Sequence, residues 1–383
     1  MDYDVSEDQR LIRDTVRELC RTEFAPHAER WDREAIVPRE ALSVLAEHGF
    51  LGMAIPEAWG GVGYDSRTVA LVIEEIARVS AALAIMISVH NSVGAVPVLR
   101  FGTDEQKRRF LPRLVSRELS AFSISEPEAG SDAGHLQATA VRGDRHYVLN
   151  GNKNWVTNGE QAGIYLVFAR TDGTAGNRGV SAFIVERGAP GLVVGRAEDK
   201  MGLRGSDTVS LSLQALEVPI ENRLGAEGDG FKIALSALDA GRIGVAAQSL
   251  GVMQAAFEEA AKYAQQRRAF GQALAKIQAI QFKLAEMERR IQCARLLIQR
   301  AAWLKDSGQP FSREASMAKV YASEAATWVT HQAVQVHGGY GYVKEYPVER
   351  YYRDARVMEI YEGTSEIQRL VIARSLLKDG VKI

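Results

Sequence analysis

The sequence predicts an α+β protein of three parts: an N-terminal α-helical domain over residues 1–120, a central β-barrel-like domain over 121–230 and a C-terminal four-helix bundle over 231–383. Two observations carry this prediction. The hydrophobic period is helical at both ends of the chain, and it changes in the middle to short alternating runs with turn signals. The chain of 383 residues is also long enough for two or three domains with a substantial core.

The N-terminal part begins with an amphipathic pattern. In SEDQRLIRDTVRELC, Ser6 is placed to cap a helix whose apolar residues recur at helical spacing. The Gly-rich stretch IPEAWGGVGYD is typical of a surface connection, and a longer apolar helix follows from Ser66. Charged residues break the apolar region 69–99, so it makes a poor membrane span.

The middle part has the period of strands. HYVLNGNKNWVTNG carries Asn-Gly pairs at 150–151 and 158–159, and both pairs are expected to form tight turns between strands. GIYLVFAR and GVSAFIVERG are short strand candidates, and TVSLSLQ alternates apolar with polar residues. Several short strands with turn signals predict a compact barrel or sandwich.

The C-terminal part contains four helix candidates, which begin near Phe231, Lys276, Ser312 and Ser365. We expect Ser312 to cap the third helix, and Ser365 with Gln368 to form a capping box at the fourth. Short links between long helices predict an antiparallel bundle.

Composition excludes several classes of function. The formal net charge of −1 gives no electrostatic basis for binding nucleic acid or an anionic membrane. The seven histidines show no ligand spacing and no Cys–His cluster exists, so we expect no metal site. Two distant cysteines indicate a reducing compartment. The acidic start shows no targeting peptide, which favours a bacterial cytoplasmic chain; a mature mitochondrial matrix protein is the alternative.

Two segments of the middle part are candidates for ligand binding. In SEPEAGSDAG, the backbone amides near Gly130 and the Ser131 hydroxyl suit a phosphate, although an ordinary turn explains the same residues. In NWVTNG, Trp155 and Thr157 suit a planar ligand, although a lone tryptophan is more often part of a core.

The combination of SISEPEAGSD, NWVTNG, LDAGRIG, RRAFG, QVHGGYGY with RYYRDAR, and IYEGTSEIQRLV closely resembles the acyl-CoA dehydrogenase family. The resemblance covers essentially the whole chain, with the motifs in the family's order. It implies the acyl-CoA dehydrogenase fold, with FAD in the cleft between the three domains.

The resemblance implies two sets of FAD-binding residues. The first set surrounds the flavin and its phosphates: Phe122, Ile124, Ser125, Gly130, Ser131, Trp155, Val156, Thr157, Thr364, Ser365 and Glu366. The second set is supplied by a neighbouring subunit: Arg267, Phe270, Gln278, Gln335, Val336, Gly338 and Gly339. Three residues of the first loop depart from the family pattern: Ser123, Glu128 and His135.

The implied reaction is α,β-dehydrogenation of an acyl-CoA thioester to a trans-2-enoyl-CoA, in which flavin N5 accepts the β-hydride. The family places its α-proton base at one of two positions. Here one of them is Gly241, which has no side chain, so the resemblance assigns the base to Glu362 and not to Glu359 or Glu366. The implied substrate contacts are Ser131, Asp239, Arg242, Gly363 and Tyr361, for which ordinary packing is the alternative.

The resemblance also implies partners. It is nearest to short-chain (butyryl-CoA) and short branched-chain members, which places the chain in fatty acid β-oxidation or branched-chain amino acid degradation. The expected electron acceptor is electron-transferring flavoprotein, and the expected assembly is a homotetramer built as a dimer of dimers. An acyl-CoA oxidase that uses O₂ and a DNA-binding flavoprotein of the same fold are the alternatives.

Overall fold

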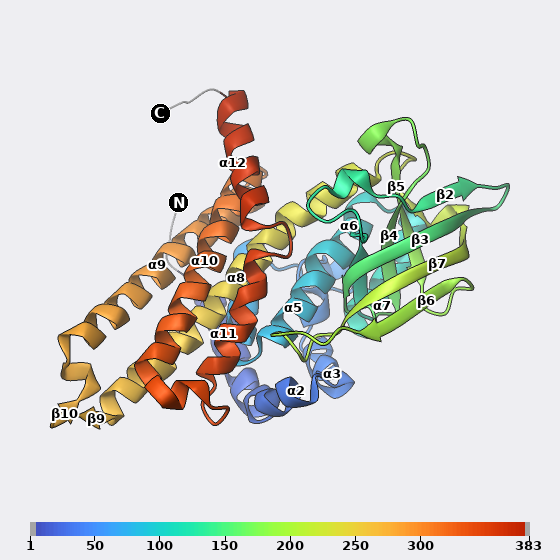
Figure 1. Cartoon of the computed structure of the whole chain (residues 1–383). Helices are drawn as coiled ribbons and strands as arrows, with labels where there is room; N and C mark the ends of the chain where they lie inside the picture. The colour runs from blue at the N-terminus through green and yellow to red at the C-terminus, as the bar shows by residue number, and fades with distance from the viewer. Residues whose placement is uncertain (1–4, 380–383) are drawn as a thin grey trace.

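The computed structural model describes residues 5–379. Its N-terminal part is helical (Figure 1). Ser6 caps α1 (Glu7–Leu19) as predicted, and Gln9 completes a capping box with it. Short 3₁₀ and π turns join the helices that follow: α2 (Ala28–Glu34), α3 (Arg39–Glu47), α4 (Ser66–Val79), α5 (Ala81–Val89), α6 (Val96–Phe101) and α7 (Asp104–Ser116).

The stretch Ala81–Phe101 is long and apolar enough to cross a membrane by length and composition, and 83% of its most apolar window is buried inside the fold. The charges that break the apolar region 69–99, Glu74, Glu75 and Arg78, lie in α4 and leave this shorter stretch uninterrupted. Its first part belongs to the main hydrophobic core, where α5 packs on the long helix α8 (Gly230–Gln266), and Ala95 and Val98 belong to a second core cluster.

The middle part forms an eight-stranded sheet beside the helices (Figure 1). Seven strands follow the order β6-β7-β3-β2-β4-β5-β8, and β1 pairs in parallel with β4. Their bounds are β1 (Ser120–Ser123), β2 (Thr139–Arg142), β3 (His146–Thr157), β4 (Ile164–Arg170), β5 (Val180–Glu186), β6 (Leu192–Ala197), β7 (Thr208–Pro219) and β8 (Arg223–Leu224).

One of the two predicted Asn-Gly turns is wrong. Asn150 and Gly151 lie inside β3, where the register against β7 shifts. A Cβ on Gly151 would stand 2.7 Å from the Cβ of Ala138, so this glycine permits a close approach of β3 to the residue that precedes β2. Asn158 does begin the turn after β3, with φ +65°, and its side-chain amide donates to the backbone carbonyls of Met86 and Ser120.

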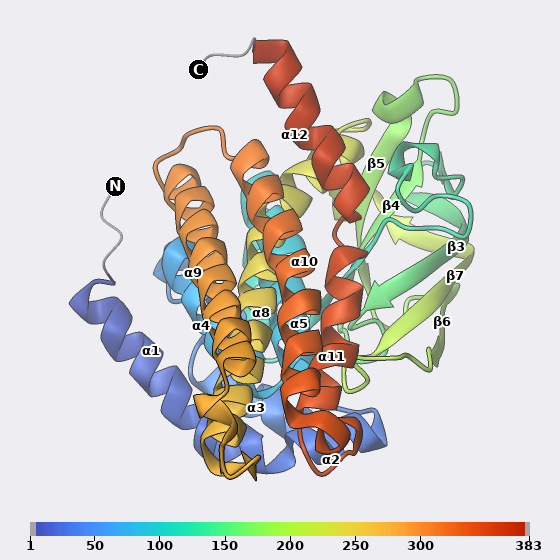
Figure 2. The same cartoon turned by 60° about the vertical axis from the view of Figure 1, so that its left-hand side comes forward.

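The C-terminal helices α8, α9 (Gln278–Asp306) and α10 (Ser312–His337) pack side by side, and α4 covers another face of α8 (Figure 2). A hairpin of β9 (Arg268–Ala269) and β10 (Gln272–Ala273) joins α8 to α9. An additional helix, α11 (Val348–Arg356), packs on α8 and α10. The last helix, α12 (Ser365–Asp379), packs on α10 and extends beyond it.

Both predicted serine caps of the C-terminal part are wrong. Phe311 occupies the N-cap position of α10, and the Ser312 hydroxyl donates instead to Asp239. At α12 the hydroxyl of Thr364 accepts from the Ile367 N–H at 3.4 Å, while Gln368 turns back to the loop before the helix. Gln368 therefore holds the loop before the helix and does not form a capping box with Ser365.

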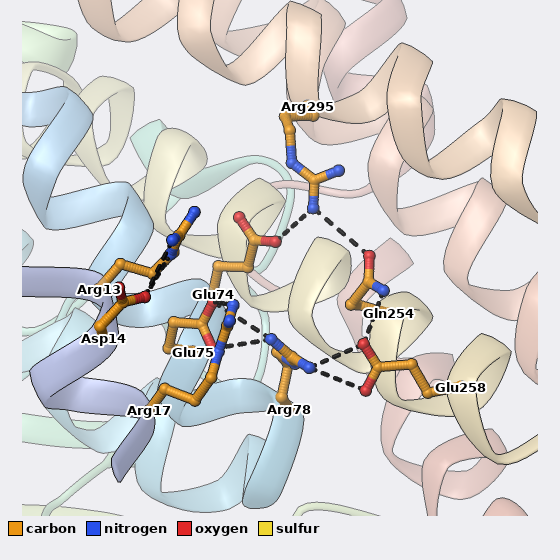
Figure 3. Close-up of polar contacts among 9 residues, drawn as sticks. All are labelled: Arg13, Asp14, Arg17, Glu74, Glu75, Arg78, Gln254, Glu258 and Arg295. Carbon is orange, nitrogen blue, oxygen red and sulfur yellow. Dashed lines mark hydrogen bonds and ion pairs between the residues drawn. The ribbon is translucent and has the colours of Figure 1, made fainter. Parts of the chain in front are cut away.

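Buried ion pairs join the N-terminal helices to the C-terminal ones (Figure 3). Glu75 of α4 is 4% exposed and accepts from Arg17 of α1 at 2.7 Å and from Arg78 at 2.9 Å. Arg78 also reaches Glu258 of α8 at 2.7 Å. Because the network spans three helices, it fixes the helical layers relative to one another.

Candidate active site

The loop between α11 and α12 carries the residue pair at the centre of the site. Glu362 has φ +54° and Gly363 has φ +91°, so both lie in the left-handed region, which is unusual for a glutamate. Two side chains hold this turn by its carbonyls. Lys319 Nζ donates to the Gly363 oxygen at 2.7 Å, and Gln368 Nε2 donates to the same oxygen at 2.8 Å and to that of Glu362 at 3.2 Å. Strained backbone that is held from several sides is typical of functional sites.

The Glu362 carboxylate has a buried oxygen that is free to accept a hydrogen bond. Its Oε2 atom is covered and has no hydrogen-bond partner among the described residues. Burial raises the pKa of Glu362 from 4.5 to about 7, against the opposing effect of the Arg242 and Lys319 cations. The carboxylate faces α8, because a Cβ on Gly241 would stand 2.9 Å from Oε2. A carboxylate with a pKa near neutrality is suited to act as a general base.

Asp239 and Arg242 of α8 form a polar cluster close to Glu362. Arg242 is buried and donates to Asp239 at 2.5 Å and to Ser316 of α10 at 3.2 Å, while the Ser312 hydroxyl donates to Asp239 at 2.8 Å. The Arg242 Nε atom is buried and has no partner among residues 5–379. The structure thus brings Asp239 and Arg242 to the neighbourhood of Glu362.

Lys319 is a site residue that the sequence analysis missed. It is fully buried, and burial lowers its pKa to about 8 against the opposing effect of Glu362. A sequence signal exists, because Lys319 shares a helical face with Ala315, Ala322 and Ala326, all buried. A lysine on a face that is otherwise made of small apolar residues indicates a buried cation, which needs a partner.

The two neighbouring glutamates differ from Glu362 in their surroundings. Glu359 accepts from the Thr327 hydroxyl and pairs with Arg356 at 3.2 Å. Glu366 is exposed in the first turn of α12. Tyr361 donates its hydroxyl to Gln248 of α8, whose amide donates in turn to the Ala81 carbonyl at 2.7 Å. Tyr361 is therefore tied to the core beside the site.

The loop after β1 is held by a buried carboxylate. Glu126 accepts from the N–H groups of Gln137 and Ala138 at 2.5 and 3.0 Å, and from Lys153 Nζ at 2.7 Å. The neighbouring Gly130 has open space where a side chain would lie, and Ser131 is exposed. Ser125 is joined to β3 through its carbonyl, which accepts from the Asn154 N–H at 2.9 Å. Glu126 and Lys153 were not predicted as parts of this site.

Trp155 lies on a bulge in β3. The register between β3 and β7 shifts between Lys153 and Val156, and Trp155 has φ +60° there. Its side chain is 63% exposed, which excludes the interpretation as a core residue. Val156 points the other way and is fully buried, so its backbone alone is available to a ligand; Ile124 is buried as well.

The second set of predicted FAD residues lies elsewhere in the chain. Arg267, Val336, Gly338 and Gly339 line a cavity of about 740 Å³ where α8, the β9–β10 hairpin and the end of α10 meet. Phe270, at the tip of the hairpin, is 93% exposed with φ +50°. Gln278, at the start of α9, and Gln335, near the end of α10, are exposed. The hairpin is at the far end of the helices from the β-sheet, so one chain does not bring the two sets together (Figure 1).

The residues of the first set fit a large polar cofactor. Ser365 of this set, and Ser123 and Gln368 close to it in sequence, each have a buried side-chain oxygen without a hydrogen-bond partner among residues 5–379. Buried polar atoms are almost always paired, so these three indicate a missing ligand or water. The exposed Trp155 adds a flat apolar surface, and the open backbone at Gly130 adds room. Within the same residues, no group of three or more His, Cys, Asp or Glu side chains is arranged to hold a metal ion.

The site lies between a helical part, a β-sheet and a second helical part, and the same three-part order is found by comparison with known families. Residues 6–118 match the N-terminal domain of acyl-CoA dehydrogenase, residues 121–216 the middle domain and residues 228–377 the C-terminal domain. The chain belongs to the acyl-CoA dehydrogenase family. Members of the family are FAD-dependent, and FAD complexes occur among the structural neighbours. The protein is an acyl-CoA dehydrogenase.

Individual relatives match over nearly their full length. An acyl-CoA dehydrogenase of Bacillus subtilis is 49% identical over 97% of this chain and 99% of its own. The mitochondrial short-chain specific acyl-CoA dehydrogenase of Mus musculus is 47% identical over 98% of this chain and 91% of its own.

Two solved structures superpose on the fold. Butyryl-CoA dehydrogenase from Megasphaera elsdenii is 44% identical, with a TM-score of 0.97 over 98% of this chain and 100% of that one. A chain in a structure described as the electron transferring flavoprotein of Acidaminococcus fermentans is 45% identical, with a TM-score of 0.98 over 99% and 100% of the two chains.

Proposed function

We propose that this acyl-CoA dehydrogenase acts on short-chain acyl-CoA thioesters and that Glu362 is its α-proton base. The observation that carries the proposal is the Glu362 carboxylate, which is covered, unpartnered at Oε2 and has a pKa of about 7. At neutral pH such a group exchanges a proton readily with a weak carbon acid placed beside it. Neither Glu359 nor Glu366 has a buried carboxylate oxygen without a hydrogen-bond partner in the described part of the chain.

Each neighbour of the base has a distinct proposed task. The positive φ of Glu362 and Gly363 orients the turn so that the Glu362 N–H faces the thioester carbonyl and stabilises enolate charge as it develops. Gly363 and Gly241 leave space for the acyl chain on either side of the carboxylate. Tyr361 forms a wall of the acyl pocket, and Asp239 with Arg242 binds the pantetheine side of the substrate.

The proposed cofactor contacts follow from the fit of the first set of residues. Ser131 and the amides near Gly130 bind phosphate, Trp155 and Thr157 lie along the flavin ring, and the start of α12 at Thr364, Ser365 and Glu366 completes the contacts. A helix N-terminus favours a phosphate through its free N–H groups and dipole. FAD supplies, when bound, the acceptor for the hydride that leaves the β-carbon.

The proposed assembly follows from the separation of the two sets. A second chain would bring its Arg267, Phe270 and Gln335 region to the cofactor of the first, which requires at least a dimer and fits a tetramer. The names of the relatives support a short acyl chain, since they include short-chain specific and butyryl-CoA dehydrogenases. The family resemblance and one structural neighbour's description support electron-transferring flavoprotein as the electron acceptor.

An anaerobic titration tests the proposal. The oxidised holoenzyme is mixed in turn with butyryl-, isobutyryl-, isovaleryl-, hexanoyl- and octanoyl-CoA, and the rate of flavin bleaching is ranked. We expect butyryl-CoA or a short branched acyl-CoA to bleach fastest, and re-oxidation to be faster with electron-transferring flavoprotein than with O₂. Fastest bleaching by octanoyl-CoA would contradict the short-chain assignment, and rapid re-oxidation by O₂ would favour an oxidase.

A further inference from the structure

Lys319 lies in the middle of α10 with its side chain fully buried. A buried ammonium group is costly unless it is hydrogen-bonded and its charge is compensated. Its Nζ donates to the Gly363 carbonyl at 2.7 Å, directly beside Glu362. Among residues 5–379, no carboxylate lies within 4.0 Å of this Nζ in an ion pair. The charge of Lys319 therefore acts on its surroundings without a contact ion pair.

The charged groups that face Lys319 come from several elements. Arg242 faces it from α8, Glu324 from α10 itself, and Glu359 and Glu362 from the chain between α11 and α12. Of these, Arg242 already donates to Asp239 at 2.5 Å and Glu359 is paired with Arg356. Glu362 is the acid in this group whose carboxylate has a covered oxygen without a hydrogen-bond partner in the described chain.

We propose that Lys319 is a positioning residue for proton abstraction: through the Gly363 carbonyl it fixes the turn that carries Glu362, and its buried charge keeps that base ionised. The inference rests on the proposed role of Glu362. It assigns Lys319 no contact with the substrate. The lysine acts through the backbone of the turn and through the electric field at the carboxylate.

The electrostatic part has a definite sign. Burial raises the pKa of Glu362, and the cations of Arg242 and Lys319 oppose that rise. Removing the Lys319 charge therefore raises the pKa of Glu362 further and leaves less of the base ionised at neutral pH. A nearby opposite charge typically shifts a pKa by about one unit or more.

The test compares three substitutions at this position. Lys319→Met removes both the charge and the hydrogen bond, Lys319→Gln keeps a donor without the charge, and Lys319→Arg keeps the charge. Lys283→Met is the matched control, because Lys283 of α9 donates to Gln332 of α10 and is not among the charges acting on Glu362. For each holoenzyme, single-turnover flavin reduction by butyryl-CoA is measured across pH, together with the pH dependence of Tm.

We expect the acidic limb of flavin reduction to move up by about one pH unit in Lys319→Met and Lys319→Gln, with a roughly fivefold lower rate at pH 7 because the parent base is about half ionised there. In Lys319→Arg and Lys283→Met, the acidic limb of flavin reduction is expected to stay at the pH of the parent enzyme. KM for butyryl-CoA should change little, since Lys319 does not touch the substrate. The stability readout is independent of activity: the decline of Tm with rising pH should extend to higher pH in Lys319→Met.

Several outcomes would overturn the inference. An unchanged acidic limb and rate in a folded, FAD-loaded Lys319→Met would do so. If Lys319→Met does not fold, Lys319→Gln decides, and a parent-like profile in that variant overturns the electrostatic role. Failure of the proposed function itself has a different signature, because in that case Glu362→Gln would also retain flavin reduction.

Discussion

Gly241 of α8 lies directly against the carboxylate of Glu362: a Cβ on Gly241 would stand 2.9 Å from Oε2 and 3.0 Å from Oε1. The two residues are 121 positions apart in the chain and meet because α8 packs against the loop that leads to α12. Position 241 is the other of the two places where the family carries its base. The structure shows that a side chain there and the Glu362 side chain would compete for the same space.

Gly241→Ala is therefore expected to impair the reaction without harming the fold. Alanine is about 1 kcal/mol more favourable than glycine inside a helix, so the helix itself gains. The added methyl group, however, displaces the flexible end of Glu362. We expect flavin reduction by butyryl-CoA to slow by roughly 10-fold to 100-fold, since small misplacements of a reacting group are costly. Stopped-flow reduction and Tm measure the two effects, and a parent-like rate would show that the carboxylate does not work from this position.

Both the activity and the stability of the protein should depend on pH through Glu362. The base works when ionised, so flavin reduction should rise with pH through about 7. Because its pKa is higher in the folded chain than the ordinary 4.5, Glu362 binds its proton more tightly when folded, and stability falls as pH rises from 4.5 to about 7. Glu362→Gln should accordingly be more stable than the parent at pH 8, by on the order of 1 to 3 kcal/mol, and similar to it near pH 4. Thermal unfolding at both pH values checks this, and an equal difference at the two would contradict it.

Phe270 is expected to serve a second chain. It is 93% exposed at the tip of the β9–β10 hairpin, where its side chain adds little to the fold of its own subunit. Phe270→Ala should therefore leave the secondary structure unchanged while FAD retention and the oligomer mass both fall. Light scattering with flavin quantification after gel filtration gives both readouts. Leu377→Ala, also an exposed apolar residue at 81%, is the control and should change neither.

The ion pairs around Glu75 should matter for stability and not for chemistry. Glu75 is buried and accepts from Arg17 and Arg78, so Glu75→Ala removes one carboxylate partner of Arg78 and leaves Glu258 as another (Figure 3). Because Arg78 keeps Glu258 and Arg17 is 47% exposed, the expected cost is that of lost charged hydrogen bonds, about 1.5 to 3 kcal/mol. We expect a clear fall in Tm, with the flavin reduction rate per bound FAD unchanged. The exposed pair of Arg21 and Glu18 offers the comparison, because Glu18→Ala should cost little.

Much of the fold was predictable from local patterns. The α1 cap at Ser6 and the strands β4, β5 and β7 follow from hydrophobic period and turn chemistry. The errors arose where tertiary contacts override a local signal. Asn150-Gly151 reads as a turn, but the packing of Ala138 against Gly151 keeps it inside a strand. The Ser312 hydroxyl is recruited by Asp239 from a distant helix instead of capping its own.

The site was less predictable than the fold. Family motifs indicate Glu362 and the segments around Ser131 and Trp155, because those residues stand in recognisable runs. Lys319 stands outside such runs and Lys153 directly precedes one, and the importance of both depends on the groups that burial brings beside them. A buried lysine is recognised from the sequence by its place on an apolar helical face or strand, but its partner is a matter of three-dimensional packing.

Single-turnover reduction of the Glu362→Gln holoenzyme by butyryl-CoA tests the central claim most directly. Glutamine keeps the shape of the side chain and removes its basicity, so the variant should retain FAD and bind butyryl-CoA. Its flavin should then be reduced more slowly than the parent flavin by several orders of magnitude, on the order of 10³-fold or more. Reduction at close to the parent rate would show that another group removes the α-proton and would contradict the assignment of Glu362.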